Sequence, residues 1–576
     1  SMRRSQTRRA TQRGPAFPPS CWPLQSPLVA ECDGDGRKWQ LAVGGVPWII
    51  PDKVMIAAGL SCRRLIAPGL ALVVVLSLAS AVAADWPQYR GANHDGISTD
   101  RLNKQWTGAA TNPLWRLVVP NSLSSLTVSG GRVFTQTRRV VDGEDKEVCV
   151  ALDAATGVEL WSRPVEDAGY PESGVGYDDG PRSTPVVHDG SVFVLSSSNK
   201  LWRLNAANGA VIWSKDLVAL YGSQVIPWQN AASPVIENSL IYVNVSCSEQ
   251  TLFALRASDG EPEWRSQNEA MTHSTPVLAT IHGVRQVIFA TQSGLVALDP
   301  VTGTRLWNFN YPFPYGTSIA VSPVVHQDMA FICGSQLYNM GSVTVRVSFS
   351  NEVWTATQLW ANTGLSSTLA SHWMTPVAHE GFLYGQFGVQ QFDTVNAQLK
   401  CVEMRTGTVK WSVNGFGRGG TLLVDNHLVS LTERGALVLV RPNTNAYIEL
   451  ARFTAIPNYF GDTNKCWNAP AVCDGRLFVR STAFVAAFDL SVPALVAESP
   501  QFGALGLEFT VRTASGAPID SNRFAGLQVL TSTNPAVPLP QWTILTHNPV
   551  LIGGVVRVGP IAPDGQPQRF FIVSEP

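Results

Sequence analysis

Side chains that could bind a ligand recur at one position of this 576-residue chain, mostly a few residues before Ser-Pro and Thr-Pro dipeptides or their diverged equivalents. They are aromatic, cationic and amide groups, with two acidic residues slightly upstream. Such a mixture can stack on a ligand, donate hydrogen bonds to it and neutralise its charges. We interpret the set as a candidate ligand-binding rim; the alternative is a solvated rim whose aromatic rings only close the structure. The set comprises Asp178, Asp179, Arg182, Asn230, His273, His372, Trp373, Arg418 and Trp467.

Residues typical of other chemistry form no recognised motif. Six cysteines follow residue 84, but none are adjacent and no Cys-x-x-Cys occurs, which excludes the usual zinc, redox and c-type haem signatures. No Gly-x-Ser-x-Gly elbow of a hydrolase is present. Four histidines recur at or near hairpin turns, each in a different repeat, so we interpret them as turn residues and expect no metal site. These histidines are His188, His326, His379 and His427.

The composition narrows the class of protein. Apolar residues make up 45% of the chain and charged residues 15%, so disorder over most of the chain is excluded. The formal net charge is −1, and the basic excess lies in the first 84 residues. The remaining body is mildly acidic and has no basic stripe, which argues against nucleic acid as a partner.

A repeat governs residues 110 to about 495 and must position the candidate rim. Segments such as CVALDAATGVELW and LVALDPVTGTRLW end in tryptophans that are spaced 43 to 53 residues apart. A glycine stands four residues before most of these tryptophans, in a Thr-Gly, Asn-Gly or Asp-Gly pair typical of tight hairpins. The tryptophans are Trp161, Trp213, Trp264, Trp307 and Trp411, with Trp360 in a diverged copy.

Each repeat predicts a four-stranded antiparallel sheet, because a second hairpin such as STPVVHDGSVFVL precedes each tryptophan hairpin. One such sheet cannot bury both faces, so the copies must pack face to face in a ring. The tryptophans are expected to wedge between neighbouring sheets. First strands begin near eight positions, which predicts eight blades, with seven as the alternative. The positions are Ser124, Ser183, Ala232, Ser274, Val321, Met374, Gly420 and Asn468.

The two ends of the repeat region are predicted to meet. The eighth copy lacks a closing tryptophan strand, whereas NPLWRLVV, centred on Trp115, precedes the first copy and has no sheet of its own. We expect the Trp115 strand to complete the eighth sheet. The first strands would then begin near the central axis, which places the candidate rim around one mouth of the channel.

The repeats resemble those of the pyrroloquinoline-quinone (PQQ)-like β-propeller family, whose pattern is A-x-D-x-x-T-G-x-x-x-W. Ala151, Asp153, Thr156, Gly157 and Trp161 match this pattern. The resemblance covers about 400 residues and implies an all-β, eight-bladed propeller of four-stranded antiparallel blades. It is far less specific for activity, because the family contains both dehydrogenases and non-enzymatic scaffolds. One similar scaffold is the propeller subunit of the outer-membrane β-barrel assembly machinery.

An enzymatic alternative follows from this resemblance: a PQQ- and Ca²⁺-dependent dehydrogenase that oxidises an alcohol or a sugar. Family enzymes hold PQQ between a tryptophan and a disulfide of two adjacent cysteines, and bind Ca²⁺ through Glu, Asn and Asp. This chain has no adjacent cysteines. Its acidic residues also form no recognisable Ca²⁺ cluster, although hard oxygen ligands are what Ca²⁺ prefers.

The flanking regions differ from the repeats. Residues 65–84 are apolar, follow two arginines and end in Ala-Val-Ala, which predicts a secretory signal peptide at 55–84; a transmembrane helix is the alternative. Residues 1–54 are interpreted as a disordered extension or a mis-assigned start. The propeller is assigned to 85–498. Residues 499–576 predict a small β-sandwich-like domain, with Trp542, Phe570 and Phe571 as core anchors.

Together these features predict an exported, non-enzymatic binding or scaffolding platform of the cell envelope, without a cofactor. The expected partner is an envelope protein, a polysaccharide or a small ligand, with no nucleic acid and no stable membrane span after signal cleavage. We expect a periplasmic, outer-membrane-associated or secreted location. The alternatives are the PQQ- and Ca²⁺-dependent dehydrogenase and an outer-membrane protein assembly factor.

Overall fold

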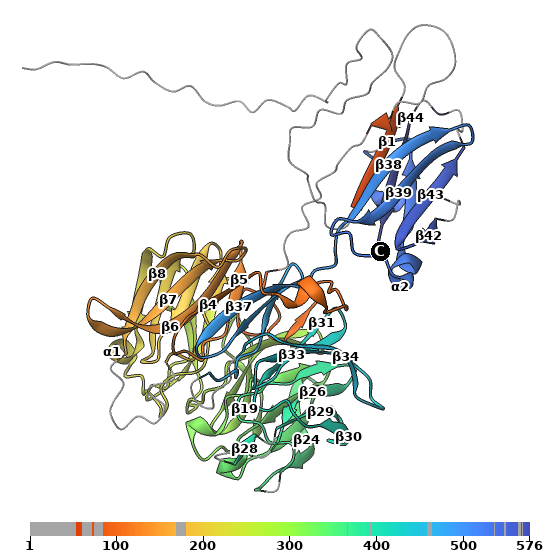
Figure 1. The fold of residues 1–576 in the computed structure, drawn as a ribbon. Helices are drawn as coiled ribbons and strands as arrows, with labels where there is room; N and C mark the ends of the chain where they lie inside the picture. The colour runs from red at the N-terminus through yellow and green to blue at the C-terminus, as the bar shows by residue number, and fades with distance from the viewer. Residues whose placement is uncertain are drawn as a thin grey trace, which may run out of the picture. The chain divides into compact units, whose positions relative to one another are not determined.

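In the computed structural model of the chain, the regular secondary structure is almost entirely β-strand (Figure 1). The structure describes residues 53–59, 72–73 and 85–575, except 169–179, 366, 389, 392–393, 396, 458–463, 535, 546–548, 563–565 and 567. The predicted extension 1–54 and signal peptide 55–84 therefore lie outside the described residues, apart from two short strands. None of the described helices is long and apolar enough to cross a membrane.

Within the described residues, the repeat region forms eight sheets of four antiparallel strands, here numbered 1 to 8 along the chain. The short strand β3 (Ile97–Ser98) joins sheet 7 as a fifth strand, parallel to β31. Sheet 1 contains β5 (Thr127–Ser129), β6 (Arg132–Val141), β7 (Glu144–Asp153) and β8 (Glu159–Asp167), and sheet 2 contains β9 (Val186–His188), β10 (Ser191–Leu195), β11 (Lys200–Asn205) and β12 (Val211–Asp216). Sheet 3 contains β13 (Val235–Glu237), β14 (Leu240–Asn244), β15 (Leu252–Arg256) and β16 (Pro262–Ser266), and sheet 4 contains β17 (Val277–Ile281), β18 (Val284–Thr291), β19 (Gly294–Leu298) and β20 (Arg305–Asn310).

Sheets 5 to 8 continue the same order from the inner to the outer strand. Sheet 5 contains β21 (Val324–His326), β22 (Met329–Cys333), β23 (Ser342–Ser350) and β24 (Val353–Asn362), and sheet 6 contains β25 (Val377–His379), β26 (Phe382–Phe387), β29 (Gln398–Glu403) and β30 (Val409–Val413). Sheet 7 contains β31 (Gly420–Val424), β32 (His427–Leu431), β33 (Ala436–Arg441) and β34 (Ile448–Thr454), and sheet 8 contains β35 (Ala471–Cys473), β36 (Arg476–Arg480), β37 (Phe484–Asp489) and β4 (Trp115–Val118). Short elements between them are β3 (Ile97–Ser98), β27 (Gln390–Gln391), β28 (Thr394–Val395), α1 (Leu217–Tyr221) and the 3₁₀ turns Gly108–Thr111, Gly316–Ser318 and Gln336–Tyr338.

The sheets close into a ring, which makes the fold an all-β propeller as predicted. First strands contact each other in several pairs of neighbouring sheets, and β35 of the last sheet contacts β5 of the first. The predicted closing strand is confirmed: β4 pairs antiparallel with β37, and Trp115 lies opposite Ala487. Sheet 8 is thus made from both ends of the repeat region, so the ring cannot open without breaking a sheet.

The tryptophans lie between neighbouring sheets, as predicted, and all except Trp307 donate a hydrogen bond to a turn of the next sheet. The indole N–H of Trp161 donates to Ala206 O at 3.1 Å, and that of Trp264 donates to Pro300 O at 3.0 Å. Trp115, Trp213, Trp360 and Trp411 make the same bond to Ala154, Ala257, Met404 and Asn443. Trp307 differs because the next sheet, sheet 5, lacks the Thr-Gly turn. The Trp307 indole N–H instead donates to the Gln286 side chain at 2.7 Å.

The Thr-Gly turns need glycine for two reasons. Gly303 has a φ of +72°, a left-handed conformation that other residues adopt only with strain. A Cβ atom there would lie 2.6 Å from the Trp264 ring, which is closer than van der Waals contact allows. Asp153 and Asp299 accept backbone hydrogen bonds within their turns and so stabilise the turn conformation.

The described chain beyond the ring forms a β module. One sheet contains β38 (Leu495–Gly503), β39 (Gly506–Thr513), β42 (Val550–Ile552) and β43 (Val555–Ile561). The other contains β40 (Gln528–Ser532), β41 (Thr543–Ile544) and β44 (Gln568–Ser574), joined by β1 (Lys53–Gly59) and β2 (Leu72–Val73) from upstream of the ring. Helix α2 (Ser521–Gly526) and the turn Leu539–Gln541 complete the module.

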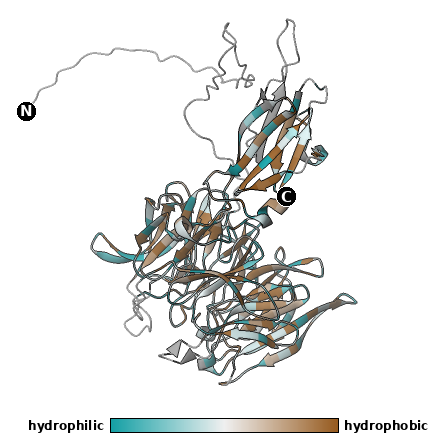
Figure 2. Ribbon diagram, turned by 45° about the vertical axis from the view of Figure 1, so that its right-hand side comes forward, coloured by the Kyte–Doolittle hydropathy of each residue, from teal (hydrophilic) through white to brown (hydrophobic). Residues whose placement is uncertain are grey.

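The two sheets of this module share one core. Phe509 from the first sheet and Phe571 and Val573 from the second belong to the same cluster of buried residues, which is sandwich-like packing. Trp542 and Phe570 are also buried, as predicted for core anchors. Hydrophobic residues concentrate in the strands of both the ring and the module, and hydrophilic residues in the connecting turns (Figure 2).

Replacing Gly303 by alanine tests the contact between neighbouring sheets. We expect a loss of about 3 kcal/mol in the free energy of unfolding, because left-handed strain and overlap with Trp264 add up. Gly283→Ala is the matched control: it lies in the same sheet at a φ of +77° but has open space around its Cβ position. It should cost only about 1 kcal/mol. Thermal unfolding followed by circular dichroism compares the two variants, and equal melting temperatures would contradict the role given to the indole.

Candidate functional site

A central cavity of 670 Å³ lies where the first strands of all eight sheets begin. Each sheet contributes residues from the loop just before its first strand, for example Ser125 in sheet 1, Thr275 in sheet 4 and Gly419 in sheet 7. A cavity that touches all members of a ring lies on the axis of that ring. Six of the nine predicted rim residues line it: Arg182, His273, His372, Trp373, Arg418 and Trp467.

The other three predicted residues do not appear in the described lining. Asn230 is buried and stabilises its own loop: its amide donates to Ala232 O at 3.0 Å, and its side-chain oxygen accepts from Ala232 N at 3.1 Å. An asparagine that completes a turn in this way has a structural role. Asp178 and Asp179 lie outside the described residues.

An aromatic and cationic cluster forms one side of the cavity. The rings of Trp373 and Trp467 are 4.6 Å apart, and the Arg418 guanidinium lies over Trp467 at 4.6 Å and over Trp373 at 5.8 Å. Buried Glu433 pairs with Arg418 at 2.8 Å and accepts from the Trp467 indole N–H at 3.0 Å. This pairing holds Arg418 against the two rings. Among the described residues, the indole N–H of Trp373 has no hydrogen-bond partner.

A strained loop forms another part of the wall and was missed by sequence reasoning. Trp228 and Gln229 both have left-handed backbones, with φ of +66° and +57°. Arg182 Nη1 donates to Trp228 O at 3.0 Å, and His273 Nε2 bonds to Gln229 O at 2.8 Å. Two predicted rim residues therefore hold in place a loop that presents Trp228 to the cavity.

Several further lining residues were also missed. Lys465 lies over the Trp467 ring at 4.8 Å, and Tyr338 packs edge-on against His372. Tyr89 and Arg90 reach the cavity from the segment before the first sheet. Trp228 and Lys465 lie within two residues of predicted positions, so a wider window around each Ser-Pro or Thr-Pro site would have found them. No local signal marks Tyr89 or Arg90.

Residues 85–98 cross the ring beside the central cavity, and Arg90 of this segment lines the cavity. The backbone of Trp86 pairs with Val128 of sheet 1, and Gln88 Oε1 accepts from Ile236 N of sheet 3 at 3.3 Å. The Arg90 guanidinium then donates to Thr375 O and Pro376 O, next to sheet 6, at 2.9 and 2.8 Å. Strand β3 continues along β31 of sheet 7. Because sheets 3 and 7 are opposite members of the ring, this segment spans its axis.

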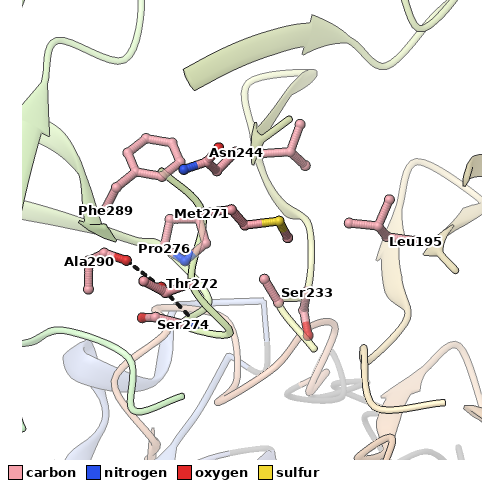
Figure 3. Close-up of a pocket in the computed structure, with 11 residues that line it drawn as sticks. Leu195, Ser233, Asn244, Met271, Thr272, Ser274, Pro276, Phe289 and Ala290 are labelled. Atoms are coloured by element: carbon pink, nitrogen blue, oxygen red, sulfur yellow. Dashed lines mark hydrogen bonds between the residues drawn. The ribbon is translucent and has the colours of Figure 1, made fainter. Parts of the chain in front are cut away.

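A second pocket, between sheets 3 and 4, is too small for a ligand. Its volume is 10 Å³, room for about one water molecule. Figure 3 shows Thr272 at its edge, where the hydroxyl donates to Ala290 O at 2.6 Å and accepts from Ser274 N at 3.2 Å. Its polar groups already bond to the protein, so we treat it as a gap between sheets.

The described lining does not fit the PQQ and Ca²⁺ site that the resemblance implies. The cavity is lined by four cationic side chains and, among described residues, by no Asp or Glu. In the part of the chain that the structure describes, no three His, Cys, Asp or Glu side chains are grouped to hold a metal ion. The six described cysteines are free, and the sequence offers no adjacent pair.

Comparisons with known proteins agree with the repeat and the ring. The family model described as outer membrane protein assembly factor BamB matches residues 145–413. The BamB of Nitrosomonas eutropha is 24% identical over 257 residues, which cover 43% of this chain and 55% of that protein. The BamB of Shewanella oneidensis is 26% identical over 317 residues, covering 52% and 74%. The chain thus spans between about half and three quarters of these relatives.

A solved structure shows the same architecture. The quinohemoprotein alcohol dehydrogenase of Comamonas testosteroni aligns with a TM-score of 0.50 and 14% identity, over 74% of this chain and 83% of that chain. At this identity the match establishes the fold alone. The closed ring of four-stranded sheets defines a β-propeller. Its tryptophan repeat and these matches make the chain similar to PQQ-like β-propeller proteins.

The buried histidine of the cavity predicts a pH dependence. Burial lowers the pKa of His273 to about 3, against about 6.5 in an unfolded chain. Between these values only the unfolded chain binds the proton, so the free energy of unfolding falls as the pH drops below about 6.5. One such group contributes up to about 1.4 kcal/mol per pH unit. Burial lowers the pKa of His94 to about 3 and that of His427 to about 4, with the same sign.

In His273→Gln the free energy of unfolding should therefore fall less between pH 7 and pH 5 than in the wild type, by the contribution of one histidine. The glutamine amide can still donate a hydrogen bond to Gln229 O. Urea unfolding midpoints at the two pH values measure this effect. His188→Gln, at a surface turn, is the control. A wild-type pH dependence in His273→Gln would show that His273 is not held neutral in the folded state.

Proposed function

We propose that this protein is an exported, non-enzymatic propeller that serves as a binding platform in the cell envelope and holds its ligand in the central cavity. The observation that carries the proposal is the lining of that cavity. The eight sheets and the segment before them line one volume of 670 Å³, and the lining includes tryptophans, tyrosines, arginines and a lysine. This volume is within the usual range for small-molecule sites. The apolar sequence at 65–84 supports export.

The rigidity of the ring suits this role. The loops before the first strands lie outside the contacts between tryptophans and turns, so their side chains can vary without loss of the fold. The Trp373–Trp467 pair, with Arg418 across both rings, provides an aromatic surface beside a fixed positive charge. Large aromatic and arginine side chains of this kind dominate binding energy at many interfaces.

A role in outer-membrane protein assembly is the second candidate. It is supported by the similarity to the family model and to the two relatives, which are outer membrane protein assembly factors. Under this candidate the partner is an envelope protein. Under the first, the ligand can also be a saccharide or another small molecule.

Capture from a cell-envelope extract by the immobilised protein tests the platform function. Trp373→Ala should reduce recovery of the bound component about tenfold or more, because the variant removes an aromatic wall of the cavity without breaking a hydrogen bond of the indole. Trp354→Ala is the matched control, since Trp354 stacks on Phe349 in the outer β23–β24 hairpin, away from the cavity. Recovery of β-barrel proteins favours the assembly candidate, and equal recovery by both variants would argue against binding in the cavity.

The enzymatic alternative is tested by adding PQQ and Ca²⁺ to the purified protein. A cofactor that binds only the folded state at 100 times its Kd would stabilise it by about 2.7 kcal/mol, an easily measured rise in melting temperature. We expect no such rise and no dye-linked alcohol oxidation, because the described lining lacks the ligands that Ca²⁺ prefers. Turnover above a protein-free blank would instead establish a dehydrogenase.

A further inference from the structure

One sheet of the β module is completed by a strand from upstream of the ring. Strand β44 lies between β40 and β1 (Figure 1). The pairing of β1 with β44 is antiparallel and runs from Lys53 opposite Ser574 to Gly59 opposite Gln568. Strand β1 also contacts β38 of the facing sheet. One edge of β44 is therefore covered by a segment that is distant in the sequence.

Strand β44 has the sequence of a strand that lies inside a fold. Phe571 and Val573 belong to the core shared by the two sheets, whereas Phe570 and Ile572 pack with Trp542. All four β44 side chains are buried. Successive side chains of a strand point to opposite faces, so β44 is apolar on both of its faces. Such a strand is favourable only where both faces are covered.

The other edges of the module are protected against pairing with another chain. Natural edge strands are commonly short, or they carry a proline or an irregular register. Among the described edge strands, β41 has two residues and β42 has three, and β38 contains Pro500 and a register shift between Glu498 and Gln501. Strand β44 has seven residues and no proline, and it pairs with β1 and β40 without a register shift. It therefore lacks the features that protect an edge.

The proposed export would remove the strand that covers this edge. The predicted signal peptide is 55–84, so cleavage after residue 84 separates β1 from the ring and the module. Strand β44 would then present its backbone N–H and C=O groups along one side. Such an edge takes up an extended segment through main-chain hydrogen bonds.

We propose that β44 of the exported protein accepts an extended apolar strand from a partner protein of the cell envelope, in the place that β1 occupies. The segment in that place, KVMIAAG, indicates the chemistry of the donor: seven residues, small or apolar apart from one charge, without proline and antiparallel to β44. Because the segment also contacts β38, the place favours a single strand over the sheet edge of a second copy. The inference rests on the proposed export and assigns a site separate from the central cavity.

Binding of a fluorescently labelled peptide of residues 53–59 to the exported, processed protein tests the proposal. We expect saturable binding with a Kd below about 100 μM. Amide hydrogen exchange should become slower in β44 but not in β42. The control peptide carries Ile56→Pro and Ala57→Pro. Since alternate residues of a strand bond to the same neighbour, one of the two prolines faces β44, and binding should weaken about tenfold or more.

The unexported full-length chain is the matched protein control, because it keeps β1. It should bind the peptide about tenfold or more weakly than the processed protein does. Ile56→Pro with Ala57→Pro in this chain should restore peptide binding. Hydrogen exchange in β39 and β43 reports whether the module stays folded in each form, since these strands belong to the facing sheet.

The donor protein is identified by displacement. Envelope proteins held by the processed protein through β44 should be released by the peptide but not by its proline form. Four results would overturn the proposal: residues 53–59 still attached to the exported protein, equal binding of the two peptides, equal peptide binding by the processed and unexported chains, or a dimer of the processed protein that the peptide dissociates. The last result would assign the place to a second copy. None of them affects the platform function if envelope capture still depends on Trp373, whereas loss of that dependence would remove the cavity function and leave the β44 site.

Discussion

Most contacts between neighbouring sheets of the ring depend on an indole that packs against a glycine in a turn of the next sheet. A four-stranded sheet is too small to bury both of its faces, and the indole supplies the missing apolar surface together with a hydrogen bond to a turn carbonyl. Glycine allows this contact because any Cβ atom would overlap the ring. Repetition of one contact gives neighbouring sheets nearly the same relative orientation, and sheets related in this way close into a circle.

Closure depends on the ends of the repeat region. Trp115 belongs to sheet 8 through its pairing with Ala487, and its indole donates to Ala154 O of sheet 1 at 3.0 Å. The same contact that joins consecutive sheets therefore joins the last to the first. Buried Arg480 adds a hydrogen bond from sheet 8 to Gln136 O of sheet 1. With the ring closed, the loops before the first strands converge on one axis and share a cavity.

The cavity combines residues that are distant in the chain, and its chemistry arises from that combination. Arg90 and Thr375 are 285 positions apart, yet their hydrogen bond fixes the segment 85–98 beside the cavity. His273 and Arg182 come from different sheets and hold the same left-handed loop at Trp228 and Gln229. Rigid sheets keep such contacts in register, so charged and aromatic groups stay close together without flexible loops to position them.

The sequence by itself determined the sheets, the contacts between them and the closing strand, because these depend on local features: alternating strands, Thr-Gly turns and tryptophans at a regular spacing. It also identified six residues of the cavity, since their position before each first strand repeats with the same period. Only the tertiary structure decided that Asn230 stabilises its own loop, that Trp307 bonds to Gln286, and that Arg90 lines the central cavity. These depend on loop conformations and on the path of residues 85–98 across the ring, which long-range contacts select and no local pattern encodes.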